Sequence, residues 1–85
     1  MIFVKICGIR RAEDVQAAVE AGANALGFNF WEGTKRYISP SDAARLIATL
    51  PETLWRVGVF VNEVPEKVVR IAAETGISVV QFHGD

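Results

Sequence analysis

Two kinds of segment alternate along the whole chain, and this alternation restricts the possible fold more than any other feature. Four short segments are apolar and rich in β-branched or aromatic residues, as buried strands are, at 2–7, 25–30, 56–61 and 78–83. Three amphipathic segments with helical periodicity separate them, at 11–21, 39–50 and 65–75. The sequence therefore predicts the order strand, helix, strand, helix, strand, helix, strand.

The ends of the predicted helices carry local signals. Gly22 and Gly76 follow the first and third helices, where glycine favours the left-handed conformation that ends a helix. Ser39 precedes the second helix as a capping residue, and Pro40 suits the first helical position. In the first helix Val15, Ala18 and Val19 are predicted to form the apolar face.

Strands joined by helical crossovers are parallel, so the expected fold class is α/β. Two architectures remain open: a doubly wound sheet with helices on both faces, or a (β/α)8 TIM barrel, of which this chain would supply about half. A dinucleotide-binding fold would need Gly-x-Gly-x-x-Gly after the first strand, and the sequence there is Cys7-Gly8-Ile9-Arg10-Arg11. A flavodoxin-like open sheet that binds a ligand at its switch point stays the alternative.

Composition excludes several classes of function. The 85 residues are 51% apolar and 22% charged with a net charge of −1, which is typical of a globular protein without a nucleic-acid footprint. The single cysteine excludes an internal disulfide framework and a cysteine-rich zinc site, and it favours a reducing, cytoplasmic location. Lys5 interrupts the N-terminal apolar run, and no run is long enough to span a membrane.

Four side chains with chemical potential lie at or near the carboxyl ends of the predicted strands: Cys7, Asn29, Asn62 and His83. In barrel enzymes the reacting groups lie at these ends. Taken alone, however, a free cysteine is more often a small buried residue than a reactive one. Cys7 is therefore open to two interpretations, a buried thiol or a catalytic group.

Five motifs in register resemble those of the phosphoribosylanthranilate isomerase family. They span nearly the whole chain and comprise Lys5-Ile6-Cys7-Gly8-Ile9, Gly22-Ala23 with Leu26-Gly27-Phe28, Lys35-Arg36-Tyr37-Ile38-Ser39-Pro40, Val57-Gly58-Val59-Phe60-Val61-Asn62 and Gln81-Phe82-His83-Gly84. Two positions depart from the usual pattern, since Arg10 replaces a threonine and Phe82 replaces a leucine. The resemblance decides between the two architectures and implies a (β/α)8 barrel.

The resemblance also implies an activity. The family catalyses an Amadori rearrangement of N-(5-phosphoribosyl)anthranilate to 1-(2-carboxyphenylamino)-1-deoxyribulose 5-phosphate in tryptophan biosynthesis. This is an aldose–ketose isomerisation and uses neither metal nor cofactor. The expected partner is thus a small phosphorylated sugar–anthranilate substrate, with no nucleic acid and no membrane.

The resemblance assigns roles to three residues. Cys7 would be the general base, Arg36 would bind the anthranilate carboxylate, and His83 would support the site by positioning substrate or tuning Cys7. A thiol needs nearby positive charge to become a thiolate at neutral pH, and Lys5 lies on the same face of the strand as Cys7. The alternatives are a solvated loop charge for Arg36 and a hydrogen-bonded structural role for His83.

Two parts of the family's site have no counterpart in this sequence. The general acid is an aspartate on a later strand, and the phosphate is held by loops near the last two strands. Asp85 is not expected to replace the acid, since it lies only two residues past His83. We therefore expect residues 1–85 to form the N-terminal half of a single barrel domain that is inactive alone. The alternative is a non-catalytic half-barrel unit that forms homo-oligomers through its unpaired sheet edges.

Overall fold

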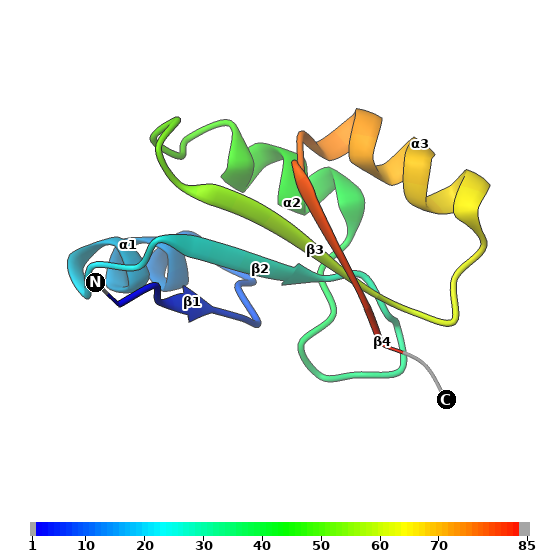
Figure 1. Ribbon diagram of the computed structural model, residues 1–85, viewed down its shortest axis with the longest axis horizontal. Helices are drawn as coiled ribbons and strands as arrows, with labels where there is room; N and C mark the ends of the chain where they lie inside the picture. The colour runs from blue at the N-terminus through cyan, green and yellow to red at the C-terminus, as the bar shows by residue number, and fades with distance from the viewer. Residues whose placement is uncertain (1, 84–85) are drawn as a thin grey trace.

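The computed structural model describes residues 2–83, so Met1, Gly84 of the last motif and Asp85 lie outside the described residues. Strands and helices alternate in the predicted order (Figure 1). The elements are β1 (Lys5–Ile6), α1 (Ala12–Glu20), β2 (Ala25–Asn29), α2 (Pro40–Ile47), β3 (Trp55–Val61), α3 (Pro65–Thr75) and β4 (Val79–His83). The prediction of an α/β chain with four strands and three helices is confirmed for this part of the chain.

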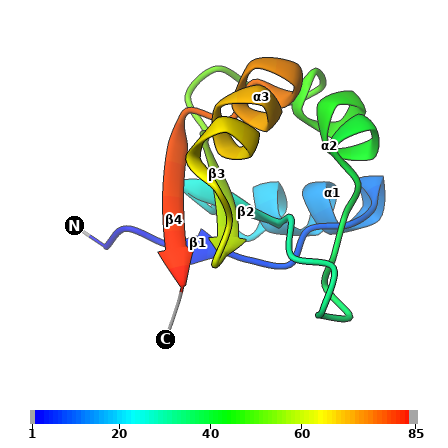
Figure 2. The ribbon, with the colours of Figure 1, turned by 90° about the vertical axis from the view of Figure 1, so that its right-hand side faces the viewer.

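The four strands form one parallel sheet in the order β1-β2-β3-β4. Each crossover moves one strand further in the same direction, and the three helices lie on one side of the curved sheet (Figure 2). A doubly wound sheet would need a reversal of strand order and helices on both faces. Within residues 2–83 the arrangement is therefore that of a partial barrel.

The first strand is shorter than predicted, with β1 limited to Lys5–Ile6 instead of 2–7. Lys5 pairs with Ala25, the first residue of β2, so the residues before Lys5 lie beyond the end of the neighbouring strand. Val4 is still held, because its carbonyl accepts from the backbone N–H groups of Asn24 and Ala25. Ile2 and Phe3 are exposed.

The helices also differ from prediction in detail. Helix α2 ends at Ile47, and the following turn is tightened by backbone bonds from Thr49 to Leu46 and from Leu50 to Ile47. In α1 the prediction for Val19 is wrong, since this side chain is 41% exposed. The helix is only nine residues long, and Val15 and Ala18 are its buried residues.

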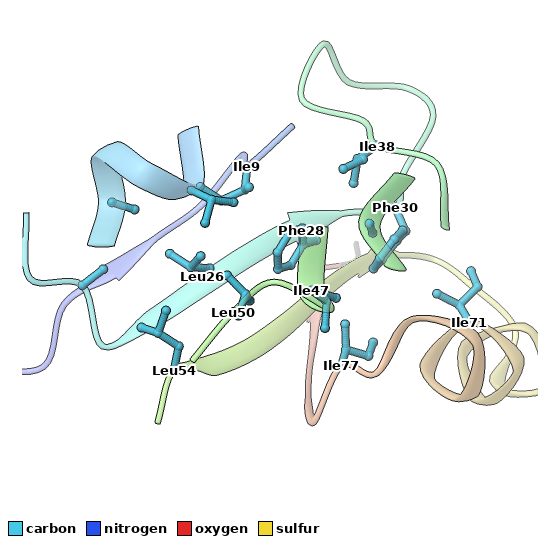
Figure 3. Packing of buried hydrophobic residues seen from close by; sticks show 14 of the residues in the cluster. Ile9, Leu26, Phe28, Phe30, Ile38, Ile47, Leu50, Leu54, Ile71 and Ile77 are labelled. Atoms are coloured by element: carbon cyan, nitrogen blue, oxygen red, sulfur yellow. The ribbon is translucent and has the colours of Figure 1, made fainter. Parts of the chain in front are cut away.

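The hydrophobic core lies between the helices and the face of the sheet that they cover. Leu26, Phe28 and Phe60 project from β2 and β3 and are fully buried there. Ile47 from α2 and Ile71 from α3 pack against the same cluster (Figure 3). Burial of a side chain of this size stabilises a fold by roughly 1.5–3 kcal/mol. The core thus fixes the helices to one face, and the other face carries polar side chains together with Val59 and Val61 of β3.

Candidate functional site

An open cavity of about 540 Å³ lies at the carboxyl ends of the strands, on the face that the helices do not cover. Its lining comes from the segment after β1, the ends of β2, β3 and β4, and the loop between β2 and α2. The lining residues are Cys7, Gly8, Asn29, Trp31, Thr34, Arg36, Val59, Val61, Gln81 and His83. No carboxylate is among the described residues that line it.

Cys7 follows β1 directly and is exposed in the cavity, so its interpretation as a buried thiol is wrong. Its side chain lies against Gly27 of β2, and a Cβ atom at Gly27 would be 2.9 Å from Sγ and 3.3 Å from the Cα of Cys7. A side chain at position 27 would therefore collide with Cys7. The glycine creates the space in which the thiol lies.

Arg36 is brought to the same cavity by the backbone around Gly8. Gly8 has a φ of +81°, a conformation that glycine adopts without steric cost. A Cβ atom there would lie 3.0 Å from Cδ of Arg36, so the arginine stem crosses directly over the glycine. This contact sets the guanidinium beside the segment that carries Cys7. Among the residues described, no carboxylate forms an ion pair with Arg36.

The loop that carries Arg36 is fixed at both ends. The backbone N–H of Arg36 donates to Oγ1 of Thr34 at 3.2 Å, which forms a local turn. Asn29 and Tyr37 form an isolated parallel bridge, and the N–H of Ile38 donates to the carbonyl of Asn29 at 2.9 Å. These bonds attach the loop to the end of β2 and hold Arg36 at the cavity wall.

His83 reaches the cavity from the end of β4. Residues two apart on a strand share one face, so Gln81 lies beside it on the same side of the sheet. Nε2 of Gln81 and Nε2 of His83 are 2.7 Å apart. Oε1 of Gln81 accepts in turn from the ammonium group of Lys5, which extends from β1 across two intervening strands. Among the described residues, the ammonium group of Lys5 is therefore hydrogen-bonded to Gln81 and not to Cys7.

The structure brings the three predicted site residues, Cys7, Arg36 and His83, into a single cavity. Asn29 also lines it, whereas Asn62 is exposed outside it with a φ of +49°. Sequence reasoning missed Thr34, although a threonine two residues before Arg36 is the signal of a side-chain-to-backbone turn. Val59 and Val61 also line the cavity, and their place there follows from the sheet register, which the sequence does not show.

The described part of the chain gives no indication of a metal centre or a membrane anchor. Residues 2–83 contain no group of three histidine, cysteine or acidic side chains that could hold a metal ion. Within the same range no helix has the length and apolar character that crossing a bilayer requires.

Comparison with known proteins finds one family. Residues 4–85 match the family model described as N-(5'-phosphoribosyl)anthranilate (PRA) isomerase. An N-(5'-phosphoribosyl)anthranilate isomerase from Thermotoga petrophila is 52% identical over 85 residues, which is 100% of this chain and 42% of that relative. The chain therefore spans less than half the length of the curated relative that it matches.

Solved structures agree with this similarity. A phosphoribosyl anthranilate isomerase in complex with reduced 1-(o-carboxyphenylamino)-1-deoxyribulose 5-phosphate superposes with a TM-score of 0.96 at 52% identity, covering 100% of this chain and 44% of the other. A structure described as mutually generated monomers of the dimeric enzyme from Thermotoga maritima gives a TM-score of 0.93 at 51% identity, covering 99% and 42%. At these scores the fold of the chain is that of the corresponding part of these proteins.

Proposed function

The chain belongs to the N-(5'-phosphoribosyl)anthranilate isomerase family, and we propose that it supplies the general base and the carboxylate-binding residue of such an isomerase. The observation that carries this proposal is the single cavity into which Cys7, Arg36 and His83 project. The reaction proposed is the Amadori rearrangement of N-(5-phosphoribosyl)anthranilate in tryptophan biosynthesis, an aldose–ketose isomerisation. A relative of the same fold is known in complex with a reduced form of the product.

In this reaction an acid protonates the ring oxygen of the sugar, the C–O bond breaks, and an imine forms at the first carbon. Cys7 as thiolate then removes the proton from the second carbon, and the electron pair moves toward the imine nitrogen to give an enolamine. Tautomerisation of the enolamine yields the ketose. A base must lie within hydrogen-bond distance of the proton that it removes. The exposed thiol of Cys7 in the cavity wall meets the requirement of access.

Arg36 is proposed to bind the anthranilate carboxylate. A guanidinium group presents parallel N–H donors that match the two oxygens of a carboxylate. Arg36 lines the cavity and lies over Gly8, one residue from the proposed base. The amino group of the substrate would thereby be held near the thiol, which is the kind of positioning that accelerates a reaction between bound groups.

The acid and the phosphate site are not supplied by the residues that line this cavity. As in the family, we propose that both come from later strands and loops of a complete barrel. The 85 residues alone would then lack ring-opening catalysis and the binding energy of the phosphate, and turnover by the isolated chain should be undetectable.

A chimera tests the proposed function. The 85 residues replace the aligned 85 residues of the Thermotoga petrophila relative, which then provides the remaining barrel. Turnover of phosphoribosylanthranilate is followed by fluorescence. We expect activity in the chimera, and a loss of about 10²-fold or more in kcat with Cys7→Ala, because a positioned base contributes at least that factor. A folded chimera in which Cys7→Ala leaves kcat unchanged would exclude Cys7 as the base.

Arg36 and its neighbour Lys35 form a matched pair of variants. Both are exposed cations of the same loop, but only Arg36 lines the cavity. Arg36→Gln should raise KM by about tenfold or more, which corresponds to the roughly 1.5–3 kcal/mol of a hydrogen bond to a charged group. Lys35→Gln should leave KM within a factor of two. Equal effects of the two variants would indicate general electrostatic attraction instead of a specific carboxylate contact.

A second candidate function is assembly, and the edges of the sheet favour it. Strands β1 and β4 each pair on one side only within residues 2–83. Phe82 on β4 is 63% exposed although its ring lies 6.2 Å from that of the buried Phe60. Two copies would provide eight strands, the number that closes a barrel, and we propose a homo-oligomer on this ground. Light scattering after size exclusion should give at least twice the monomer mass, and a monodisperse, native monomer would refute it.

A further inference from the structure

A chain of hydrogen bonds crosses the uncovered face of the sheet from β1 to β4. Lys5 donates through Nζ to Oε1 of Gln81, and the amide nitrogen of Gln81 lies 2.7 Å from Nε2 of His83. Lys5 and Gln81 are half-buried, and their strands are not neighbours in the sheet. The contact therefore depends on the curvature that brings the two edges of the sheet toward one another.

The chemistry of the first donor, Lys5, fixes which group donates and which accepts in both hydrogen bonds. An ammonium group has three N–H donors and no acceptor, so the Gln81 atom that meets Lys5 must be the carbonyl oxygen. The other side-chain atom of Gln81 is then the NH₂ group, which can only donate. The atom of His83 that faces it, Nε2, must accept with its lone pair. An imidazole whose Nε2 accepts carries its proton on Nδ1.

We propose that Lys5 and Gln81 are positioning residues that hold His83 as the neutral Nδ1–H tautomer, so that it acts at the site as an N–H donor and not as a proton acceptor. The basic lone pair of the ring is occupied by the Gln81 amide. Within residues 2–83 no group accepts a hydrogen bond from Nδ1, so none of these residues competes with a ligand for this N–H.

This tautomer determines which group of the cavity can accept a proton and which can donate a hydrogen bond. Its titratable side chains within the described range are Cys7, Arg36 and His83. Arg36 is a permanent cation, and His83 in the proposed tautomer has no free lone pair, so Cys7 alone can accept a proton. An Nδ1–H donor can bind a hydroxyl or carbonyl oxygen of a sugar without competing for the proton that Cys7 removes. The assignment of this role to a sugar substrate rests on the proposed function, whereas the tautomer itself does not.

The chain contains a single histidine, so nitrogen NMR of the chain labelled with ¹⁵N-histidine reports on His83 alone. The spectrum is recorded at pH 8.5, where an ordinary imidazole is neutral. We expect a pyrrole-type signal from Nδ1 and a pyridine-type signal from Nε2. The reverse assignment, or averaged signals such as a freely exchanging imidazole gives, would overturn the proposal.

Two variants and one control test the donor and acceptor roles in the hydrogen bonds from Lys5 through Gln81 to His83. Gln81→Glu replaces the amide by a carboxylate that only accepts, so the proton of His83 should move to Nε2 and the two signal types should exchange. Lys5→Met lets the amide rotate, and the signals should shift toward the average of the two tautomers. Lys67→Met removes a lysine of α3 that pairs with Glu63, and it should change neither signal.

Unchanged spectra in both Gln81→Glu and Lys5→Met would overturn the proposal, because the tautomer of His83 would then not depend on these two residues. Failure of the proposed function has a different signature, because a chimera with the expected tautomer and no turnover would refute the isomerase assignment alone. In the chimera, the effect of Gln81→Glu is measured by kinetics. The variant should lower kcat and leave KM, which reports binding through Arg36, unchanged.

Discussion

Gly27 should be among the least replaceable residues of the site, because its missing side chain makes the space for Cys7. An alanine Cβ would lie 2.9 Å from Sγ, 3.3 Å from Cα and 3.4 Å from Cβ of Cys7. Relief of the first contact requires Sγ to leave its position beside Gly27, and the contact with Cα cannot be relieved by rotation at all because it belongs to the backbone. The segment after β1 must therefore move away from Gly27→Ala, and overpacking of this kind costs roughly 1–3 kcal/mol.

Urea and thermal unfolding followed by tryptophan fluorescence measure this cost. The chain concentration is held fixed, so that any association of copies affects the parent and the variant alike. For a domain of this size the expected destabilisation lowers Tm by roughly 4–20 °C. The same substitution in a Cys7→Ala background removes the sulfur contact, so it should cost at least about 0.5 kcal/mol less, as coupled neighbours do. Equal costs in the two backgrounds would refute the reasoning, and so would a Gly27→Ala variant as stable as the parent.

Three further predictions concern α2, α3 and the residues next to them. Ser39 caps α2 by accepting from the N–H of Asp42 at 3.2 Å, so Ser39→Ala should lower the free energy of unfolding by about 0.5–2 kcal/mol in urea titrations. Gly76 ends α3 with a φ of +87°, and Gly76→Ala should cost roughly 1–2 kcal/mol in the same assay. The Val64 N–H donates to the Glu63 carboxylate and, with Lys67 assisting, holds the pKa of Glu63 below its ordinary 4.5. The resulting stability is present above this pH and is lost as the pH falls through the folded-state pKa, so acid unfolding of Glu63→Gln, followed by circular dichroism, should show a shallower pH dependence below 4.5 than the parent.

Much of the local structure could be predicted from the sequence, because its signals involve residues close together in the chain. The helix α3 was predicted at its observed bounds, since Pro65 fits the first turn and Gly76 takes the left-handed conformation that ends it. Ser39 and Pro40 marked the start of α2 in the same way. The extent of β1 could not be predicted, because it depends on where β2 begins at Ala25.

For the candidate site, too, the sequence identified residues, while their contacts and exposure depended on the tertiary structure. The sequence identified Cys7, Arg36 and His83 through motifs that resemble one family, and it placed two of them at strand ends. It could not show that Cys7 is exposed or that its thiol lies against Gly27, because exposure and a contact with another strand are set by the tertiary structure. Nor could it show that Arg36 lies over Gly8, which is a contact between two loops.

By itself, then, the sequence determined the alternation of strands and helices, the ends of the helices and the residues able to do chemistry. These features follow from backbone preferences and from the periodicity of apolar side chains, which act over a few residues. The tertiary structure decided that all helices cover one face and that the sheet curves so that Lys5 meets Gln81. Such contacts depend on strand register and twist summed over the whole sheet, which no short segment of the sequence contains.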